Sequence, residues 1–136
     1  MALIKKEEIP AVALTEMNDV HYEEIEIINQ LHELVLSEQN IELISEKLQE
    51  LKAHTIAHFA NEERLMQEHR FPPYPIHKYN HDMFLNEIAM LAQNWESTKD
   101  KKPLKIFLET TLPEWLHNHI STLDTVTAMF LNEKIG

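Results

Sequence analysis

Residues 58–81 read HFANEERLMQEHRFPPYPIHKYNH. Each end of this stretch carries two side chains of the kind that bind metals, four residues apart: His58 with Glu62, and His77 with His81. Residues four apart lie on one face of an α-helix, one turn from each other, close enough to share or bridge metal ions. Three prolines stand between the pairs, and proline breaks the helical hydrogen-bond ladder. The stretch therefore predicts two consecutive helices that each present a pair of ligands.

Apolar residues at alternating steps of three and four predict four helices in all. We expect them from a Thr15 or Asn18 cap to about Ser37, from an Asn40 cap to about His69 or Arg70, from about Ile76 to Trp95 or Glu96, and from near Pro103 onward. Phe71–Pro75 and Ser97–Lys102 are the expected non-helical connections, and Pro113 should kink or split the fourth helix. Short connections favour an all-α, up-down-up-down four-helix bundle. Residues 15–136 would form this single domain, with residues 1–14 as an N-terminal arm packed across it.

Composition excludes several classes of function. The net charge of −11 would repel nucleic acids and anionic membrane surfaces. There is no cysteine for disulfides, thiolate-bound zinc or thiol catalysis, and the single glycine disfavours hairpin-rich β folds. The longest apolar run, Ile88–Ala92, is too short to span a bilayer, and no signal-peptide core follows the N-terminus. We expect a cytoplasmic protein with no membrane insertion and no nucleic-acid partner.

Polar residues of the metal-binding type interrupt the apolar seam of every predicted helix. The second seam reads Ile41, Ile44, Leu48, Leu51, Thr55, His58, Glu62, Leu65. The other three seams contain His21, His77 with His81, and His119, and the chain has nine histidines in all, an unusual number. A buried polar group without a partner costs about 1–3 kcal/mol, and a whole domain is stable by only about 5–15 kcal/mol. These groups must therefore satisfy one another, and a shared metal centre does so.

Simpler explanations exist for each feature alone. A single pair of histidines four residues apart is common on helix surfaces, and one histidine in a seam is more often a hydrogen-bonded core residue. Interruption of all four seams together favours a metal centre. The residue types do not fix the metal, because imidazole also suits zinc, copper and nickel.

The order and spacing of these residues resemble a known signature. His21, in Asn18-Asp19-Val20-His21, stands eight residues before Asn29, and the motifs that follow are His58-Phe59-x-x-Glu62-Glu63-x-x-Met66, His77-Lys78-x-x-His81-x-x-Phe84 and Trp115-Leu116-x-x-His119-Ile120-x-x-x-Asp124. From about residue 18 to 126 this ordered set resembles the hemerythrin family, as in bacterial hemerythrins. Residue type, order and spacing agree together, which makes the resemblance specific.

The resemblance implies seven protein ligands to two iron ions: His77, His81 and His119 on one, His21 and His58 on the other, and Glu62 and Asp124 bridging both. An oxo or hydroxo group would form a third bridge, and molecular oxygen would bind end-on at the iron that has two histidines. Asp124 follows His119 by five residues and so does not share its helical face. The chain should therefore turn or loosen between these two residues.

Two departures from the family pattern concern the N-terminal part. Residues 9–14 replace the family's tryptophan segment, and Asp19-Val20-His21 stands where an acidic-Gln-His sequence is usual. They affect the packing of the arm and access to the pocket, and they leave the ligand set intact.

The remaining histidines and the aromatic residues are predicted to lie outside the ligand set. We expect His54, His69 and His117 on the surface. His32 lies in the first seam and should be a hydrogen-bonded core residue, with an outer role near the metal centre as the alternative. The aromatic residues Phe59, Phe84 and Trp115 should pack in the core and keep the centre dry.

The function that these observations favour is reversible binding of molecular oxygen, as a carrier, store or delivery protein rather than an enzyme. A sensor of oxygen, nitric oxide or redox state is one alternative. A di-iron peroxidase or oxidase is another. Oxygen-activating bundles use mostly carboxylates with Glu-x-x-His pairs, whereas this set has five histidines and two carboxylates.

Overall fold

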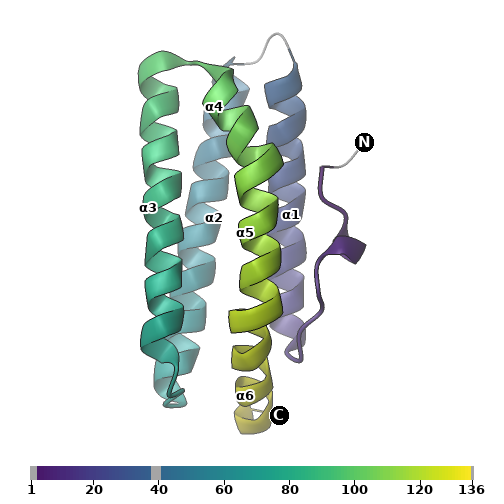
Figure 1. The fold of residues 1–136 in the computed structure, drawn as a ribbon, viewed down its shortest axis with the longest axis vertical. Helices are drawn as coiled ribbons and strands as arrows, with labels where there is room; N and C mark the ends of the chain where they lie inside the picture. Colours follow the sequence, from purple (N-terminus) through teal and green to yellow (C-terminus); the bar gives the residue numbers. More distant parts are fainter. Residues whose placement is uncertain (1–2, 38–40, 136) are drawn as a thin grey trace.

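The computed structural model describes residues 3–37 and 41–135. The helices are α1 (Thr15–Leu36), α2 (Ile41–Glu68), α3 (Tyr74–Thr98), α4 (Lys101–Ile106), α5 (Leu112–His119) and α6 (Thr125–Ile135), after a short 3₁₀ helix, η1 (Lys6–Glu8). Figure 1 shows α1, α2 and α3 as three long columns, with α4, α5 and α6 following one another as the fourth. The predicted all-α four-helix bundle is confirmed.

The apolar seams meet in one core along the bundle axis. From α1, the side chains of Ile25, Ile28 and Leu31 are buried, and similar stripes from the other helices face them. Ile41 is an exception, because it is 46% exposed although the seam pattern placed it inside. It is the first residue of α2, at the very end of the bundle, and its side chain lies outside the packed core.

Two of the predicted connections are too long, because the helices beside them extend further than expected. The third helix begins at Tyr74, because Pro75 falls in the first turn, where no backbone donor is needed. The connection predicted for Ser97–Lys102 shrinks to two residues, since α3 continues to Thr98 and α4 begins at Lys101, capped by the Asp100 side chain. The predicted Asn40 cap lies outside the described residues. The predicted Thr15 or Asn18 cap is wrong, because α1 already begins at Thr15, and Leu14 before it provides no side-chain cap.

The chain ends two helices with left-handed residues that are not glycine. Arg70 has φ of 55° and Lys99 has φ of 54°. After Arg70, the Phe71 N–H reaches back to the Met66 carbonyl at 2.9 Å, which closes the end of α2. A side chain with a Cβ is strained in this conformation, so these positions carry a local cost.

Arg70→Gly should therefore raise the free energy of unfolding by about 0.5–1 kcal/mol, because glycine relieves the strain but also gains freedom when unfolded. Thermal unfolding would show a rise of about 2–5 °C. Lys99→Gly should raise the free energy of unfolding by less, because this variant also loses the Lys99–Glu96 ion pair of 2.7 Å. An unchanged or lower melting temperature for Arg70→Gly would contradict the strain argument.

Two π-helical segments interrupt the fourth column, which confirms the predicted kink or split. Segment η2 (Phe107–Thr111) precedes Pro113, whose missing N–H prevents a regular ladder, and η3 (Ile120–Asp124) separates α5 from α6. In each segment one N–H reaches back five residues: Leu112 to the Phe107 carbonyl, and Thr125 to the Ile120 carbonyl. Each widened turn takes up one extra residue, and such turns occur frequently at functional sites.

The residues before α1 lie along its outer side (Figure 1). Ile4, Ile9 and Val12 are buried there. The Asn29 side chain holds Ile4 through two hydrogen bonds of 2.9 Å, one to its N–H and one to its carbonyl. Asn18 holds Val12 in the same way, at 2.8 and 2.9 Å. These side-chain amides fix an extended segment without any strand.

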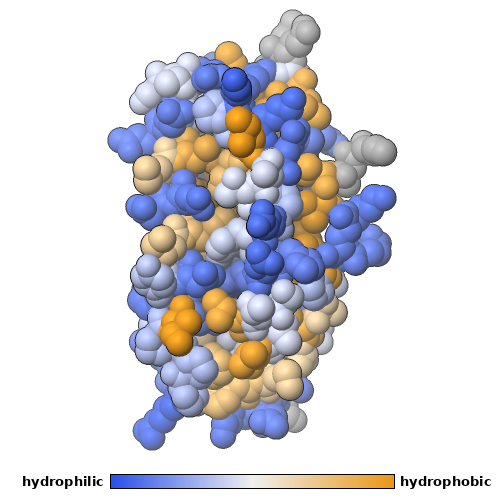
Figure 2. All heavy atoms as spheres, viewed as in Figure 1, coloured by the Kyte–Doolittle hydropathy of each residue, from blue (hydrophilic) through white to orange (hydrophobic). Residues whose placement is uncertain are grey.

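Figure 2 shows the face formed by α3 and the fourth column, on which hydrophobic and hydrophilic side chains are interleaved. Exposed apolar residues of these helices include Ile76, Met90 and Ile106. Within residues 3–37 and 41–135, no helix has both the length and the apolar character that a membrane crossing requires.

Candidate metal centre

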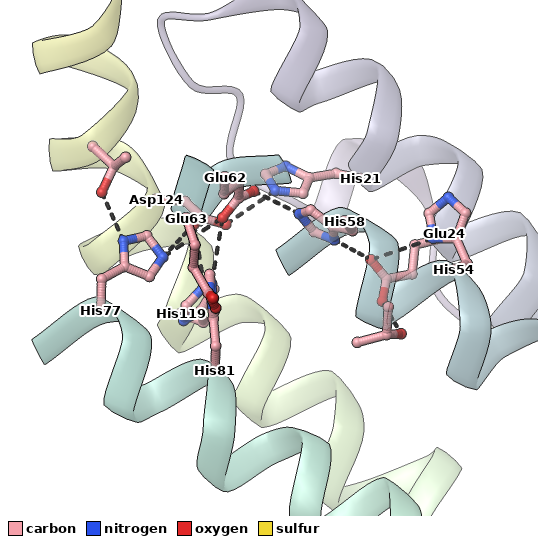
Figure 3. A network of polar contacts seen from close by, with 12 residues as sticks. His21, Glu24, His54, His58, Glu62, Glu63, His77, His81, His119 and Asp124 are labelled. Atoms are coloured by element: carbon pink, nitrogen blue, oxygen red, sulfur yellow. Dashed lines mark hydrogen bonds and ion pairs between the residues drawn. The ribbon is translucent and has the colours of Figure 1, made fainter. Parts of the chain in front are cut away.

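The seven predicted ligand residues meet in the interior of the bundle, as Figure 3 shows. They come from all four columns and fall into two groups that could each hold a metal ion: Glu62, His77, His81, His119 and Asp124 in the first, and His21, His58 and Glu62 in the second. None of the seven is more than 7% exposed.

The first group gathers three imidazoles around two carboxylate oxygens. His81 Nε2 lies 3.3 Å from Glu62 Oε1, and the Nε2 atoms of His77 and His119 lie 3.2 and 3.1 Å from Asp124 Oδ1. All five of these atoms are buried and lack a hydrogen-bond partner among the described residues. They point at one another, as the ligands of a single ion would.

The second group uses the other oxygens of the same carboxylates. His58 Nε2 lies 2.6 Å from Glu62 Oε2, and His21 Nε2 lies 3.0 Å from Asp124 Oδ2. Glu62 and Asp124 thus each present one oxygen to the group with three imidazoles and the other oxygen to the group with two. This division is the arrangement of carboxylates that bridge two ions.

The donor set therefore fits a pair of metal ions. Buried polar atoms nearly always have partners, and five orphaned atoms converging on one point need an explanation. A positive ion at that point would satisfy all five. Imidazole nitrogen and carboxylate oxygen suit iron as well as other transition metals.

The π-helical segment η3 brings Asp124 into this centre. In a regular helix, a residue five positions after His119 would point elsewhere. The widened turn over Ile120–Asp124 returns the Asp124 side chain to the face of His119, where their side chains lie 3.1 Å apart. The loosening predicted between these two residues is confirmed, and it takes the form of one π turn.

Four of the five imidazoles are held from behind at Nδ1. His58 donates to Glu24 at 2.8 Å and His77 to Thr127 at 2.7 Å. His81 donates to Glu63 at 2.9 Å, and His119 to the side-chain oxygen of Asn80. In a neutral imidazole, a hydrogen bond donated from Nδ1 fixes the tautomer and leaves the Nε2 lone pair free to bind a metal.

Sequence reasoning missed these outer partners. Glu63 and Asn80 sit next to ligands, so their positions were a usable signal. Glu24 carried a weaker signal, because it is an acidic residue next to Ile25 of the first seam. In the structure it is only 4% exposed, and it also accepts a hydrogen bond from Thr55 at 2.7 Å. Thr127 gave no signal, because threonine is ordinary in a helix core.

Aromatic rings cover the first group. Phe59 stacks on His81, with ring centroids 3.8 Å apart and planes 3° from parallel. Trp115 stacks on His119 at 4.5 Å and 11°, and on Phe84 at 3.9 Å and 13°. The predicted aromatic wall is present, and it faces the three-imidazole side.

His21 is the least constrained imidazole. Its Nδ1 atom is buried, and no hydrogen-bond partner for it occurs in the described part of the chain. Its ring meets the His58 ring edge-on, with centroids 5.5 Å apart, and none of the described aromatic residues stacks on its face. The two-imidazole side is therefore held less firmly than the three-imidazole side.

The electrostatics of the metal-free chain favour ionised ligands. Burial and the nearby Asp124 would raise the pKa of Glu62, but His58 lowers it to about 2. Burial would likewise raise the pKa of Asp124, yet His119 and neighbouring hydrogen bonds bring it well below its ordinary value. Burial would lower the pKa of His58, but Glu62 and Glu24 on either side raise it well above the ordinary value. The carboxylates are charged, and His58 carries a proton.

Metal binding at pH 7 should therefore release at least about one proton per chain, because His58 must surrender the Nε2 proton before that nitrogen can bind an ion. Release should disappear when the pH exceeds the raised pKa of His58. Calorimetric titration with Zn²⁺ in two buffers of different ionisation enthalpy would measure it. Proton-independent binding at pH 7 would show that His58 is neutral in the metal-free protein.

The other histidines lie outside the ligand set. His117 is exposed, and His69 is half-buried at the end of α2. His32 is a hydrogen-bonded core residue as predicted, 2.7 Å from Glu109 in η2. His54 is not a simple surface residue, because its side chain is only 20% exposed and its Nε2 lies 3.2 Å from Glu23.

Comparisons with known proteins agree with this geometry. The hemerythrin HHE cation binding domain matches residues 12–130. Bacteriohemerythrin of Aquifex aeolicus is 31% identical over 96% of this chain and 99% of its own length, and myohemerythrin of Sipunculus nudus is 35% identical over 57% of this chain and 58% of its own. The crystal structure of wild-type hemerythrin superposes with a TM-score of 0.83 at 23% identity, covering 94% of this chain and 95% of the other.

Proposed function

Because this chain belongs to the hemerythrin family of non-haem iron, oxygen-binding domains, we propose that it binds molecular oxygen reversibly at a pair of iron ions, as a carrier, store or delivery protein. The observation that carries the proposal is the division of the Glu62 and Asp124 oxygens between two groups of imidazoles. The seven residues would hold two iron ions, with an oxo or hydroxo group as a further bridge, and such a pair would supply the electrons for oxygen binding.

The two groups of candidate ligands contain different numbers of imidazoles. His77, His81 and His119 complete one side, whereas His21 and His58 contribute only two imidazoles to the other. The second side therefore has room for an external ligand. The three-imidazole side is closed by stacked aromatic rings and serves to hold its ion in place.

The composition of the ligand set favours a site that releases bound oxygen unchanged over a site that reduces it further. Five of the seven ligand residues are histidines, which bind as neutral groups, and only two are carboxylates. Further reduction of oxygen requires higher-valent iron, which anionic ligands favour. The apolar and aromatic surroundings also limit the supply of protons.

The test is to cycle reduced protein between air and inert gas while recording the optical spectrum and assaying hydrogen peroxide. We expect two iron ions per chain and a spectrum that returns in every cycle. Stoichiometric peroxide release in the first cycle, with the iron left ferric, would favour an oxidase or peroxidase. One zinc per chain without visible charge-transfer bands would contradict the iron pair.

A sensor of oxygen, nitric oxide or redox state could use the same centre. The cycling experiment would give the same result for a sensor and a carrier, so a different readout is required. A sensor should change its hydrogen-exchange pattern on a surface helix when oxygen binds. A carrier needs no such change.

A further inference from the structure

A groove between α1 and α2 leads from the surface to the two-imidazole side of the centre. Its volume is about 290 Å³, and His58 and Glu62 are among its lining residues. His58 is 7% exposed, the largest value among the seven ligand residues, whereas His77 and His81 are fully buried. A small molecule that approaches through this groove meets the side that has room for a ligand.

The walls of the groove are mostly apolar. Leu14 lines it from just before α1, Met17 and Val20 from α1, and Ala57 and Leu65 from α2, with Asn61 as a polar exception. An ion that passes such walls loses hydration and gains few hydrogen bonds, whereas a small uncharged molecule loses little. The walls alone therefore favour uncharged ligands.

The rim of the groove is acidic. Glu16 and Glu23 lie on it. Glu23 also lines an adjoining pocket, together with Glu26 and Glu50. Of these carboxylates, Glu50 is paired with Lys47 at 2.9 Å, and Glu23 lies 3.2 Å from Nε2 of His54, which lines both pockets. No lysine or arginine of the described ranges lines either pocket. An approaching anion thus meets negative charge that no lysine or arginine of the lining offsets, on a chain whose net charge is −11.

We propose that the α1–α2 groove is the passage by which ligands reach the centre, and that its acidic rim selects uncharged ligands over anions. Dioxygen and nitric oxide would pass, and inorganic anions would be slowed by repulsion and desolvation. The proposal rests on the metal centre of the proposed function, but it does not require that oxygen be released again.

Steric variants test the position of the passage. Ala57→Leu combined with Val20→Phe should narrow the groove and slow the binding of both nitric oxide, to the reduced protein, and thiocyanate, to the ferric protein. Ala53→Leu is the matched control, because Ala53 is exposed on the same helix one turn away and does not line the groove. Iron content, measured for each variant, separates slow passage from loss of the centre. Unchanged rates in a fully loaded narrowed variant would overturn the proposal.

Charge variants test the selection. Glu16→Gln combined with Glu23→Gln should raise the rate of thiocyanate binding about fivefold at low salt, as expected for two charges removed at roughly 8 Å in water. The gain should vanish near 0.5 M salt because of screening. Nitric oxide binding should stay unchanged at every salt concentration.

Glu42→Gln combined with Glu133→Gln is the control, since it changes the net charge equally at exposed positions away from the groove. If this control accelerates thiocyanate as much as the groove variants do, the rim does not select and only net charge matters. If the variants behave as expected but bound oxygen is never released, the proposed function is wrong and the passage proposal still stands.

Discussion

Removal of the metal ions should lower the melting temperature of this protein by about 15–20 °C, which corresponds to about 5 kcal/mol for a domain of this size. The metal-free centre leaves five buried atoms without hydrogen-bond partners, on His77, His81, His119, Glu62 and Asp124. Each such atom costs about 1–3 kcal/mol, and partial rearrangement of the side chains would recover some of that loss. Ions that bind only the folded chain add their binding free energy to its stability.

Acid should weaken the metal-free protein further. The pKa values of Glu62, Asp124 and Glu24 are lowered in the folded chain, so their contribution to stability is present above about pH 4.5 and is lost as the pH falls. The lowered pKa of His119, caused by burial, acts in the same direction below about pH 6.5. His58 has the opposite sign, because its raised pKa favours the folded state at low pH. Three carboxylates and His119 outweigh it, so stability should decline from about pH 6 to pH 2.

Calorimetric melts of the loaded and chelated protein, each at several pH values, would measure both effects. Reloading with iron should restore the higher melting temperature, which controls for damage during chelation. Equal melting temperatures with and without metal would show that the polar atoms of the centre find other partners, and would count against a buried metal site.

The clustering of the candidate ligand residues was predictable from sequence because helical spacing converts directly into shared faces. His58 with Glu62, and His77 with His81, are one turn apart in the chain and remain so in the fold. The packing of the four columns then places these residues at the same level along the bundle. Asp124 was harder, since its place depends on a π turn that no simple periodicity reveals.

The outer partners were not predictable in the same way. Glu24 and Thr127 belong to different helices from the imidazoles that they support, so the contacts depend on how the helices are rotated against one another. A rotation of a few tens of degrees would send the same carboxylate to solvent. Helix ends were uncertain for a local reason, because Pro75 is compatible with the first turn of a helix as well as with a connection.

The second large effect should come from replacing ligands, and it should differ between the two sides of the centre. His77→Ala or His81→Ala removes a ligand whose ring is hydrogen-bonded at Nδ1. Loss of an outer partner alone usually weakens metal binding about 10–100-fold, so loss of the ligand itself should cost at least about a hundredfold. Both ions should be affected, because Glu62 and Asp124 contact the imidazoles of both groups.

His21→Ala should behave differently. Among the five imidazoles of the centre, it removes the one whose Nδ1 lacks a hydrogen-bond partner in the described chain. It leaves His77, His81 and His119 in place with both carboxylates. We expect this variant to keep about one iron per chain, whereas His77→Ala keeps little of either. Metal analysis after dialysis against a weak chelator would measure the retained iron.

Leucine in place of His54, His69 or His117 provides the controls, since none of these residues belongs to either ligand group. All three variants should retain two iron ions per chain and the spectrum of the unaltered protein. If His54→Leu lost the spectrum while His58→Leu kept it, the assignment of ligands on α2 would be wrong by one turn. If His21→Ala and His77→Ala lost iron equally, the two ions would bind as one cooperative unit, and the weaker support of His21 would have no consequence for retention.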